Sequence, residues 1–453
     1  MRVLITTDSF PPGCGGSGWS THDLARTLSA DGHEVAIVHL RAGLRGSRIR
    51  SYEGLTIQEH GVVAPPLPFV RNYFRNERAY RRLVPVLRDV ISKGRFDLVH
   101  AQHVLSSPPS IAAARLETVP VVCTIRDYWP VCYWSDLIHD PTAPDLCPAC
   151  SHAMMMRCIR PRAGAAWPLA TPLVPYMAAN LRRKRAAIGG ADAVVAVSSA
   201  LARDLAARAP ELSRTRLETI PNPVDLDAIT RSVGRGHPLD GRPYAVYAGK
   251  LARNKGISVL IPASERANLP WPLVVIGDGP ERDVLERAAR QSGREVRMLG
   301  WLERTEALNW LAHAGLVVFP SYGPESLSRV LLESSALGRP IAAMDTGGTR
   351  DIIVDGETGL LAHSMESLAG AIARIVADRN LADGLGTRAA AWVRERFDAR
   401  RVVSRIEALY QGLLSARSGF PADAAQGRPA GTQPRSVGSG LQAGSEDPRV
   451  SHG

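Results

Sequence analysis

The sequence lacks any apolar run close to the ~20 residues that a helix needs to cross a bilayer, which argues against a membrane-spanning segment. It also lacks a secretory pattern. The opening MRVLITTDSF carries Arg2 and Asp8, and no small-residue cleavage site follows an uninterrupted apolar stretch. We therefore expect a cytoplasmic protein.

Acidic residues are missing from one long stretch. No Asp or Glu occurs from Leu146 to Ala191, where seven Lys and Arg residues fall, and the whole chain carries a net charge of +11. Within it, residues 166–185 place aromatic and aliphatic residues before four consecutive cations. Such a segment could attach the protein peripherally to the inner, anionic face of a membrane. It could equally be a basic helix that packs on its own domain.

Short apolar runs alternate with amphipathic helical stretches through both halves of the chain, which predicts parallel sheets covered on both faces. The fold class is therefore α/β, with two Rossmann-like domains facing across a cleft. The prolines of TIPNPVDLD, residues 219–227, suggest the hinge. We expect the following parts: an acceptor domain at 1–222 with a Cys-containing insert at about 130–185, a nucleotide-sugar domain at 223–395, a helix at 396–418 that crosses back to the first domain, and a disordered tail at 419–453.

A glycine-rich loop follows the first expected strand, and Gly13, Gly15 and Gly18 match the spacing G-x-G-x-x-G. Five residues separate that strand from Gly13, and the next strand does not end in an acidic residue, so a dinucleotide fingerprint is not indicated. The alternatives are a loop whose backbone N–H groups at Gly15 and Gly16 face a phosphate, or a tight turn that needs positive φ.

The second half places candidate ligand groups where expected strands end. Lys250 and Lys255 could neutralise a diphosphate, and Gly277 offers bare backbone. Glu325 and Glu333 are eight positions apart, and a helix over 326–337 would turn both carboxylates to one side. Glu333 lies inside the apolar run VLLESSAL, where a carboxylate without a function is costly.

Together, these motifs resemble retaining glycosyltransferases of the GT-B fold, family 4, over almost everything up to about Leu414. The segments that carry the resemblance are GCGGSGWSTHDLARTLSADGHEV, FDLVHAQ, VPVVCTIRDYWPVC, ADAVVAVSSAL, IPNPVD, GKLARNKG, VIGDGP, the E-x7-E segment, ALGRPIAA and GETGLL.

The resemblance implies a retaining hexosyltransferase that moves a sugar from a nucleotide diphosphate to a glycan or lipid-linked acceptor, with no cofactor needed for catalysis and no nucleic-acid partner. Lys250, Lys255 and Gly16 would hold the diphosphate, and Glu333 the ribose. Glu325 would contact the donor sugar. The implied donor-binding set is Gly15, Gly16, Lys250, Lys255, Gly277, Ser326, Leu327 and Glu333.

One departure concerns the catalytic core. Arg126 stands before Asp127 where the family usually has His, and it can donate hydrogen bonds but cannot act as a base. We assign catalysis to Glu325 and Arg126, with His103 and Asp127 as acceptor-binding or alternative catalytic residues. The alternatives for the whole protein are a nucleotide-sugar hydrolase or epimerase of the same fold, or a catalytically degenerate sugar-nucleotide-binding subunit.

Four of the six cysteines lie in the expected insert. Cys132, Cys147, Cys150 and Cys158 follow the pattern C-x14-C-x2-C-x7-C. Disulfides are disfavoured in the cytoplasm, and four thiols suit a structural Zn²⁺ site. An iron–sulfur cluster or four ordinary thiols are the other possibilities.

Overall fold

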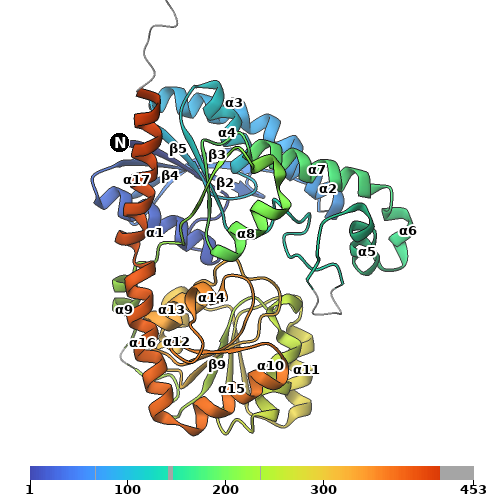
Figure 1. Ribbon diagram of the computed structural model, residues 1–453, viewed down its shortest axis with the longest axis vertical. Helices are drawn as coiled ribbons and strands as arrows, with labels where there is room; N and C mark the ends of the chain where they lie inside the picture. The colour runs from blue at the N-terminus through green and yellow to red at the C-terminus, as the bar shows by residue number, and fades with distance from the viewer. Residues whose placement is uncertain (67, 141–145, 235, 419–453) are drawn as a thin grey trace, which may run out of the picture. The chain divides into compact units, whose positions relative to one another are not determined.

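A computed structural model describes residues 1–66, 68–140, 146–234 and 236–418, so the predicted tail at 419–453 lies outside the described residues. Within Met1–Leu414 the chain builds two α/β lobes, one around each of two sheets (Figure 1). We call the elements from β1 to β8 the first lobe and those from α9 to α16 the second lobe. The predicted fold class is confirmed.

The first sheet has eight strands in the order β3-β4-β2-β1-β5-β6-β7-β8, and its pairs are parallel except for β3 against β4. The central strands are buried along their length and read as continuous apolar runs, as expected for strands covered on both faces. The strands are β1 (Arg2–Thr7), β2 (Glu34–Ala42), β3 (Ser47–Tyr52), β4 (Leu55–Val62), β5 (Leu98–Ala101), β6 (Val121–Ile125), β7 (Ala193–Ala196) and β8 (Arg216–Thr219).

The second sheet has six parallel strands in the order β11-β10-β9-β12-β13-β14. Its inner strands are also apolar and buried. The strands are β9 (Ala245–Ala248), β10 (Leu273–Ile276), β11 (Val296–Gly300), β12 (Leu316–Phe319), β13 (Ile341–Met344) and β14 (Leu360–Ala362).

Helices connect the strands in both lobes. In the first lobe they are α1 (Gly16–Ala30), α2 (Pro68–Tyr73), the π-helical η1 (Phe74–Arg78), α3 (Ala79–Gly94), α4 (Ser107–Leu116), α5 (His152–Ala163), η2 (Gly164–Ala166), α6 (Trp167–Ala170), α7 (Leu173–Ile188), α8 (Ser199–Arg208) and η3 (Pro210–Leu212). In the second they are α9 (Leu226–Ser232), η4 (Arg253–Lys255), α10 (Ile257–Arg266), α11 (Arg282–Ser292), α12 (Arg304–Ala312), α13 (Arg329–Ala336), α14 (Thr349–Ile352), α15 (Met365–Ala377) and α16 (Arg379–Phe397). The last helix is α17 (Ala399–Ser418).

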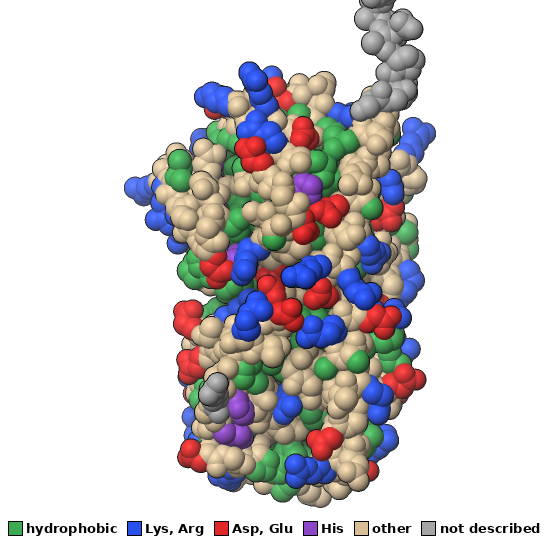
Figure 2. Space-filling view, turned by 90° about the vertical axis from the view of Figure 1, so that its left-hand side faces the viewer, with side chains coloured by type: hydrophobic (Ala, Val, Ile, Leu, Met, Phe, Trp, Pro, Cys, Tyr) green, Lys and Arg blue, Asp and Glu red, His purple; other side chains and the backbone are tan. Residues whose placement is uncertain are grey.

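The chain passes between the lobes twice, and the two crossings are hydrogen-bonded to each other. The Val224 N–H donates to the Phe397 carbonyl at 3.1 Å, and the Ala399 N–H donates to the Val224 carbonyl at 3.0 Å. Beyond this point α17 packs on the first sheet, where the Tyr410 hydroxyl lies 2.5 Å from His100 Nδ1. On the face shown in Figure 2, charged side chains of both signs gather about halfway down the molecule, between the two lobes.

The helix expected at 326–337 is shorter than predicted, because α13 begins only at Arg329. Ser328 has a non-helical ψ of 119°, and its hydroxyl accepts a hydrogen bond from the Leu331 N–H, so it caps the helix. Glu325 therefore lies in the preceding loop and Glu333 one turn into the helix. The argument that one helix turns both carboxylates to the same side was wrong.

Candidate functional site

A cavity of about 670 Å³, which we call the interlobe cavity, lies between the start of α1 and the carboxyl ends of β9, β10 and β12. Strand ends of this kind are the usual ligand-binding edge of a parallel sheet. Ten predicted site residues line it: Gly15, Gly16, Arg126, Lys250, Lys255, Gly277, Glu325, Ser326, Leu327 and Glu333.

Lys255 and Glu325 form an ion pair inside this cavity. Lys255 Nζ lies 2.5 Å from Glu325 Oε1, and the Ser321 hydroxyl donates to the same oxygen at 2.6 Å. Lys255 keeps 31% of its side chain exposed, against 9% for Glu325. The carboxylate is thus held in one orientation, while the ammonium can still reach a ligand.

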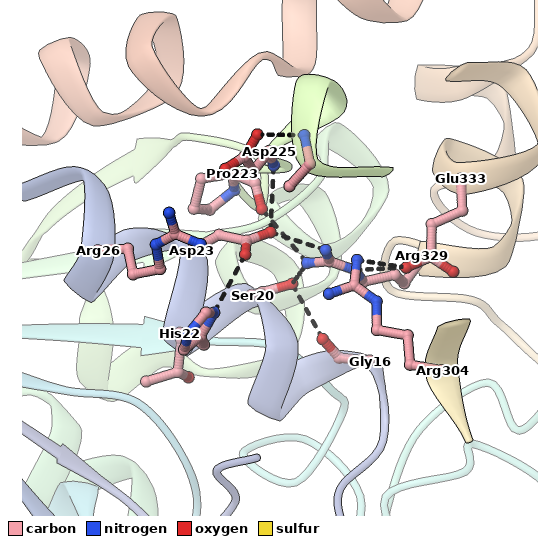
Figure 3. Close-up of polar contacts among 12 residues, drawn as sticks. Gly16, Ser20, His22, Asp23, Arg26, Pro223, Asp225, Arg304, Arg329 and Glu333 are labelled. Atoms are coloured by element: carbon pink, nitrogen blue, oxygen red, sulfur yellow. Dashed lines mark hydrogen bonds and ion pairs between the residues drawn. The ribbon is translucent and has the colours of Figure 1, made fainter. Parts of the chain in front are cut away.

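Glu333 is held by two arginines. Arg304 donates to its Oε1 at 3.1 Å and Arg329 donates to the same atom at 3.0 Å (Figure 3). Arg304 also stacks over the ring of Trp19 from α1, with 4.2 Å between its guanidinium carbon and the ring centroid. A ribose that bound Glu333 would therefore meet, or displace, the Arg304 guanidinium.

Arg329 joins the two lobes. Its guanidinium, 6% exposed, donates to Asp23 Oδ2 of α1 at 2.7 Å and to the Ser20 hydroxyl at 3.2 Å (Figure 3). Burial alone would raise the pKa of Asp23, but the charge of Arg329 holds that pKa below its usual value. The pKa of Arg329, which burial would lower, is raised by Asp23 and Glu333.

Sequence reasoning did not identify this group of residues. Arg329 lies within a run of buried residues, and the only local signal is its spacing of four positions from Glu333. Its partner Asp23 is 306 positions away along the chain. Trp19 and Arg304 gave no signal either, because their contact joins α1 to α12, which lie far apart in the sequence.

Two of the predicted glycines are required by close packing. A Cβ on Gly16 would lie 2.8 Å from Arg329 Cβ, and one on Gly277, at a φ of 129°, would lie 1.9 Å from the Gly249 carbonyl oxygen. Gly15 precedes α1 without a side-chain cap, and the first turn of α1 carries no acidic residue. The N–H groups at the start of α1 are thus suitably placed for an anion in the cavity.

Arg126 reaches the cavity from the end of β6 and is held by two amide side chains. Its Nε donates to Asn222 Oδ1 at 2.7 Å, and its Nη1 donates to Gln102 Oε1. Burial, reinforced by the charge of Arg329, lowers its pKa to about 9. Neither partner carries a charge, so the Arg126 cation is available to a negatively charged ligand.

His103 and Asp127 do not belong to the lining of the interlobe cavity in the described part of the chain. His103 Nδ1 lies 2.9 Å from the Thr7 hydroxyl and 3.4 Å from Asp8 Oδ1, and burial holds its pKa well below the usual range. Burial raises the pKa of Asp127 to about 6. The roles proposed for these two residues stay predictions.

Three of the four cysteines of the insert contact other polar groups in the described structure. Cys132 lies 3.8 Å from Asp136, the Cys147 thiol contacts the Ala149 carbonyl at 3.2 Å, and Arg162 donates to Cys158 Sγ at 3.0 Å. Burial raises the pKa of all four thiols, Cys150 included, which favours the protonated form. Among the residues that the structure describes, no three His, Cys, Asp or Glu side chains are gathered to hold a metal. The zinc site stays a prediction without support from this arrangement.

The basic segment at 166–185 forms α6 and α7, and one face of α7 is buried. Met177 and Leu181 pack into a cluster with α5, whereas Leu169 is 85% exposed. None of the helices between Met1 and Ser418, so far as the structure describes them, has the length and apolarity needed to cross a membrane.

Comparison with known proteins shows the family and the fold. Residues 14–228 match the family described as Glycosyltransferase Family 4, and residues 234–392 match Glycosyl transferases group 1. The chain belongs to these glycosyltransferase families, and its fold is GT-B.

Individual relatives are more distant. The D-inositol 3-phosphate glycosyltransferase of Xylanimonas cellulosilytica is 31% identical over 49% of this chain, and the match spans only 61% of that relative's length. Many solved structures share the fold, and two of them serve as examples. The structure of Anabaena HepE in complex with UDP superimposes with a TM-score of 0.63 at 17% sequence identity, and the match covers 91% of this chain and 100% of HepE. Sucrose-phosphate synthase from Thermosynechococcus elongatus superimposes with a TM-score of 0.66 at 19% sequence identity, and the match covers 92% of this chain and 100% of the synthase chain.

Proposed function

We propose that this protein transfers a hexosyl group from a nucleotide-diphosphate sugar to a hydroxyl of a glycan or lipid-linked acceptor, with retention of anomeric configuration. The observation that carries the proposal is that one cavity combines Lys250, Lys255 and the open start of α1 with two oriented carboxylates, Glu325 and Glu333. The cations and N–H groups suit the diphosphate of an activated sugar, and the carboxylates suit its hydroxyl groups.

In the proposed reaction the bond between the anomeric carbon and the diphosphate oxygen breaks, and that oxygen keeps the electron pair. Lys250, Lys255 and the N–H groups of α1 stabilise the negative charge that develops on it. The acceptor hydroxyl attacks the same face of the sugar, and its proton passes to the departing phosphate. Arg126, which cannot accept a proton, supports the charge on the diphosphate.

Glu325 and Glu333 orient the two ends of the donor. Glu325, fixed by Lys255 and Ser321, accepts hydrogen bonds from hydroxyls of the transferred sugar. Glu333 accepts from the ribose once Arg304 moves aside. A UDP donor is a reasonable first choice, because HepE is similar in fold and its structure contains UDP.

We further propose that the protein works in the cytoplasm and attaches to an anionic membrane through α5 to α7. Exposed Leu169 would insert among lipid headgroups while Arg157, Arg160 and Arg182 meet their phosphates. Flotation with phosphatidylglycerol vesicles tests this, and Leu169→Gln should bind less than Leu116→Gln, which changes a residue 58% exposed on α4. Equal flotation of the two variants would count against attachment through α6.

The main test is a thermal-shift screen of nucleotide-diphosphate sugars, because a ligand that binds only the folded state raises its stability. The best ligand should bind Lys255→Ala and Glu333→Ala at least ~10-fold more weakly, given the cost of losing a charged hydrogen bond, and should bind the surface control Lys93→Ala normally. Wild-type binding by both cavity variants would refute the site.

Product analysis then separates the rivals. Transfer to an added acceptor with the donor's anomeric configuration supports the proposal. Release of free sugar or an isomer without acceptor indicates a hydrolase or epimerase. Binding without turnover over a broad acceptor panel indicates a degenerate subunit, an alternative suggested by Arg126.

A further inference from the structure

A second cavity, of about 980 Å³, lies beside the two crossings between the lobes, and we call it the hinge cavity. It shares no lining residue with the interlobe cavity within the described ranges. Its walls come from both lobes: Val197, Thr219 and Pro221 from the first, and Arg350, Asp351, Trp392, Glu395, Arg396, Phe397, Arg400, Arg401, Ser404 and Arg405 from the second lobe and α17.

The charge of this lining is unbalanced. Arg350 is neutralised by Asp345, to which its Nε donates at 2.8 Å, and Asp351 is occupied by the N–H and hydroxyl of Ser199, at 2.6 and 2.5 Å. Four arginines remain, Arg396, Arg400, Arg401 and Arg405, against two carboxylates of the lining, Asp351 and Glu395. Within residues 1–418 as described, no ion pair joins any of these four to an acidic side chain.

Two of these arginines stand where a helix disfavours them. Arg400 and Arg401 lie in the first turn of α17, which contains no acidic residue. The positive end of a helix dipole repels cations and attracts anions. Asp398 accepts a hydrogen bond from the Arg400 N–H at 3.1 Å, but it precedes the helix and does not line the cavity. A bound anion would relieve this repulsion.

The remaining lining adds specificity for a ligand larger than an ion. Arg405 is oriented by donating to the Thr219 carbonyl at 2.7 Å, and Arg396 lies over the Trp392 ring at 3.8 Å. The Trp392 indole N–H is buried and, in the described structure, has no hydrogen-bond partner. The guanidinium groups suit a phosphate ester, which accepts several charge-assisted hydrogen bonds. The indole N–H itself is shielded from the cavity by the surrounding atoms.

We propose that the hinge cavity is a second ligand site, which binds a small phosphate-bearing molecule and is separate from the interlobe cavity. Because the Val224–Phe397 and Val224–Ala399 hydrogen bonds lie beside it and both lobes line it, an occupant stabilises the observed arrangement of the lobes. The proposal does not depend on glycosyl transfer.

Calorimetric titration of the full chain with pyrophosphate, at constant ionic strength, tests the site. The variant Lys250→Ala/Lys255→Ala removes the two lysines of the interlobe cavity and should still bind one pyrophosphate in the hinge cavity. Adding Arg400→Gln/Arg401→Gln should weaken that binding by roughly tenfold or more, because each lost contact is a charge-assisted hydrogen bond. The matched control adds Arg287→Gln/Arg290→Gln on α11, which removes the same charge from another exposed surface and should leave binding unchanged.

Several outcomes would overturn the proposal. The first is that Lys250→Ala/Lys255→Ala binds no pyrophosphate. The second is that both arginine pairs, when replaced, weaken pyrophosphate binding equally. The third is that the protein binds phosphatidylglycerol vesicles through Arg400 and Arg401 but does not bind soluble pyrophosphate. A circular-dichroism melt checks that the exposed substitutions leave the fold intact. In addition, pyrophosphate should change the fluorescence of the wild type more than that of Trp392→Phe, and an equal change would place the ligand elsewhere.

Discussion

The two walls of the interlobe cavity differ in how their charged groups are arranged. In the wall from the second lobe, opposite charges meet directly, as Lys255 with Glu325 and Arg304 with Glu333. In the wall from the first lobe, Arg126 is held by neutral amides, and His103 and Asp127 lie outside the cavity lining among the residues described. Arg329 links the two lobes at this cavity, through Asp23 of α1 and Glu333 of α13.

This difference indicates a division of labour. A carboxylate that is already held in place by an opposite charge needs little reorganisation when a polar ligand binds it. In the second lobe, hydroxyls of the sugar donor could therefore take over contacts that Lys255 and Arg304 now make. The first lobe contributes backbone N–H groups and Arg126, and Lys250 of the second lobe likewise takes part in none of the ion pairs found among the described residues. Four predictions test this contrast, taken from the largest expected effect to the smallest.

Replacing Arg329 should have the largest effect, because it leaves two buried carboxylates without their shared cation. Arg329→Met should lower the free energy of unfolding by about 3–5 kcal/mol, measured by urea denaturation. The partly exposed control Arg282→Met, which breaks a surface pair with Glu286, should cost no more than about 1 kcal/mol. The double variant Asp23→Asn/Arg329→Met should lose less stability than the sum of the losses in the two single variants. If its loss equals that sum, the ion pair does not couple the walls.

Replacing Glu325 should affect the reaction more than the fold. Glu325→Gln keeps the shape but loses the charge that orients Lys255, and we expect kcat to fall by about 10²–10³, the usual cost of losing one preorganised electrostatic contact. Glu303 also lines this cavity but has no predicted role, so the control Glu303→Gln should keep a kcat near that of the wild type. A similar loss in both variants would mean that net charge, not the position of Glu325, controls turnover.

Much of the fold was predictable because its strands are apolar. Runs such as VLITT and LVVF predicted the buried central strands, whereas SRIRSY and LTIQEHGV, which form β3 and β4, were missed. In these strands polar residues alternate with apolar ones, and Glu59 of β4 is fully buried against Arg48 and Arg50. A buried ion pair between strands leaves no apolar signal in the sequence.

The candidate site divides in the same way. Lys250, Lys255, Glu325 and Glu333 stand in local motifs at strand ends, so their presence in one cavity could be expected. The Asp23–Arg329 pair depends on how the two lobes meet, which no local motif records. The start of α13 was missed because the capping role of Ser328 depends on its own backbone angles.

A smaller effect should follow from acid. The pKa of Asp23 is lowered in the folded state, so its contribution to stability is fully present above its unfolded value of about 3.9 and is lost as the pH falls below that value. Asp23→Asn should therefore be less stable than wild type by about 1–3 kcal/mol at pH 7, and the gap should narrow below about pH 4. Asp31→Asn, an exposed control at the end of α1, should show no such gap. A gap for Asp23→Asn that is constant down to pH 2 would exclude the ion pair as its cause.

The smallest effect should come from His103, and it decides whether the first lobe supplies a titrating group. His103 is neutral at ordinary pH because burial lowers its pKa, and it faces Thr7 and Asp8, not the interlobe cavity. His103→Gln keeps a group that can hydrogen-bond Thr7, so kcat should stay within about threefold of wild type, a change below 1 kcal/mol. The pH profile of kcat between pH 5 and 8 should also keep its midpoint. A large loss of kcat together with the disappearance of a titration in that range would make His103 the base that Arg126 cannot be, and the contrast between the two walls would then have to be abandoned.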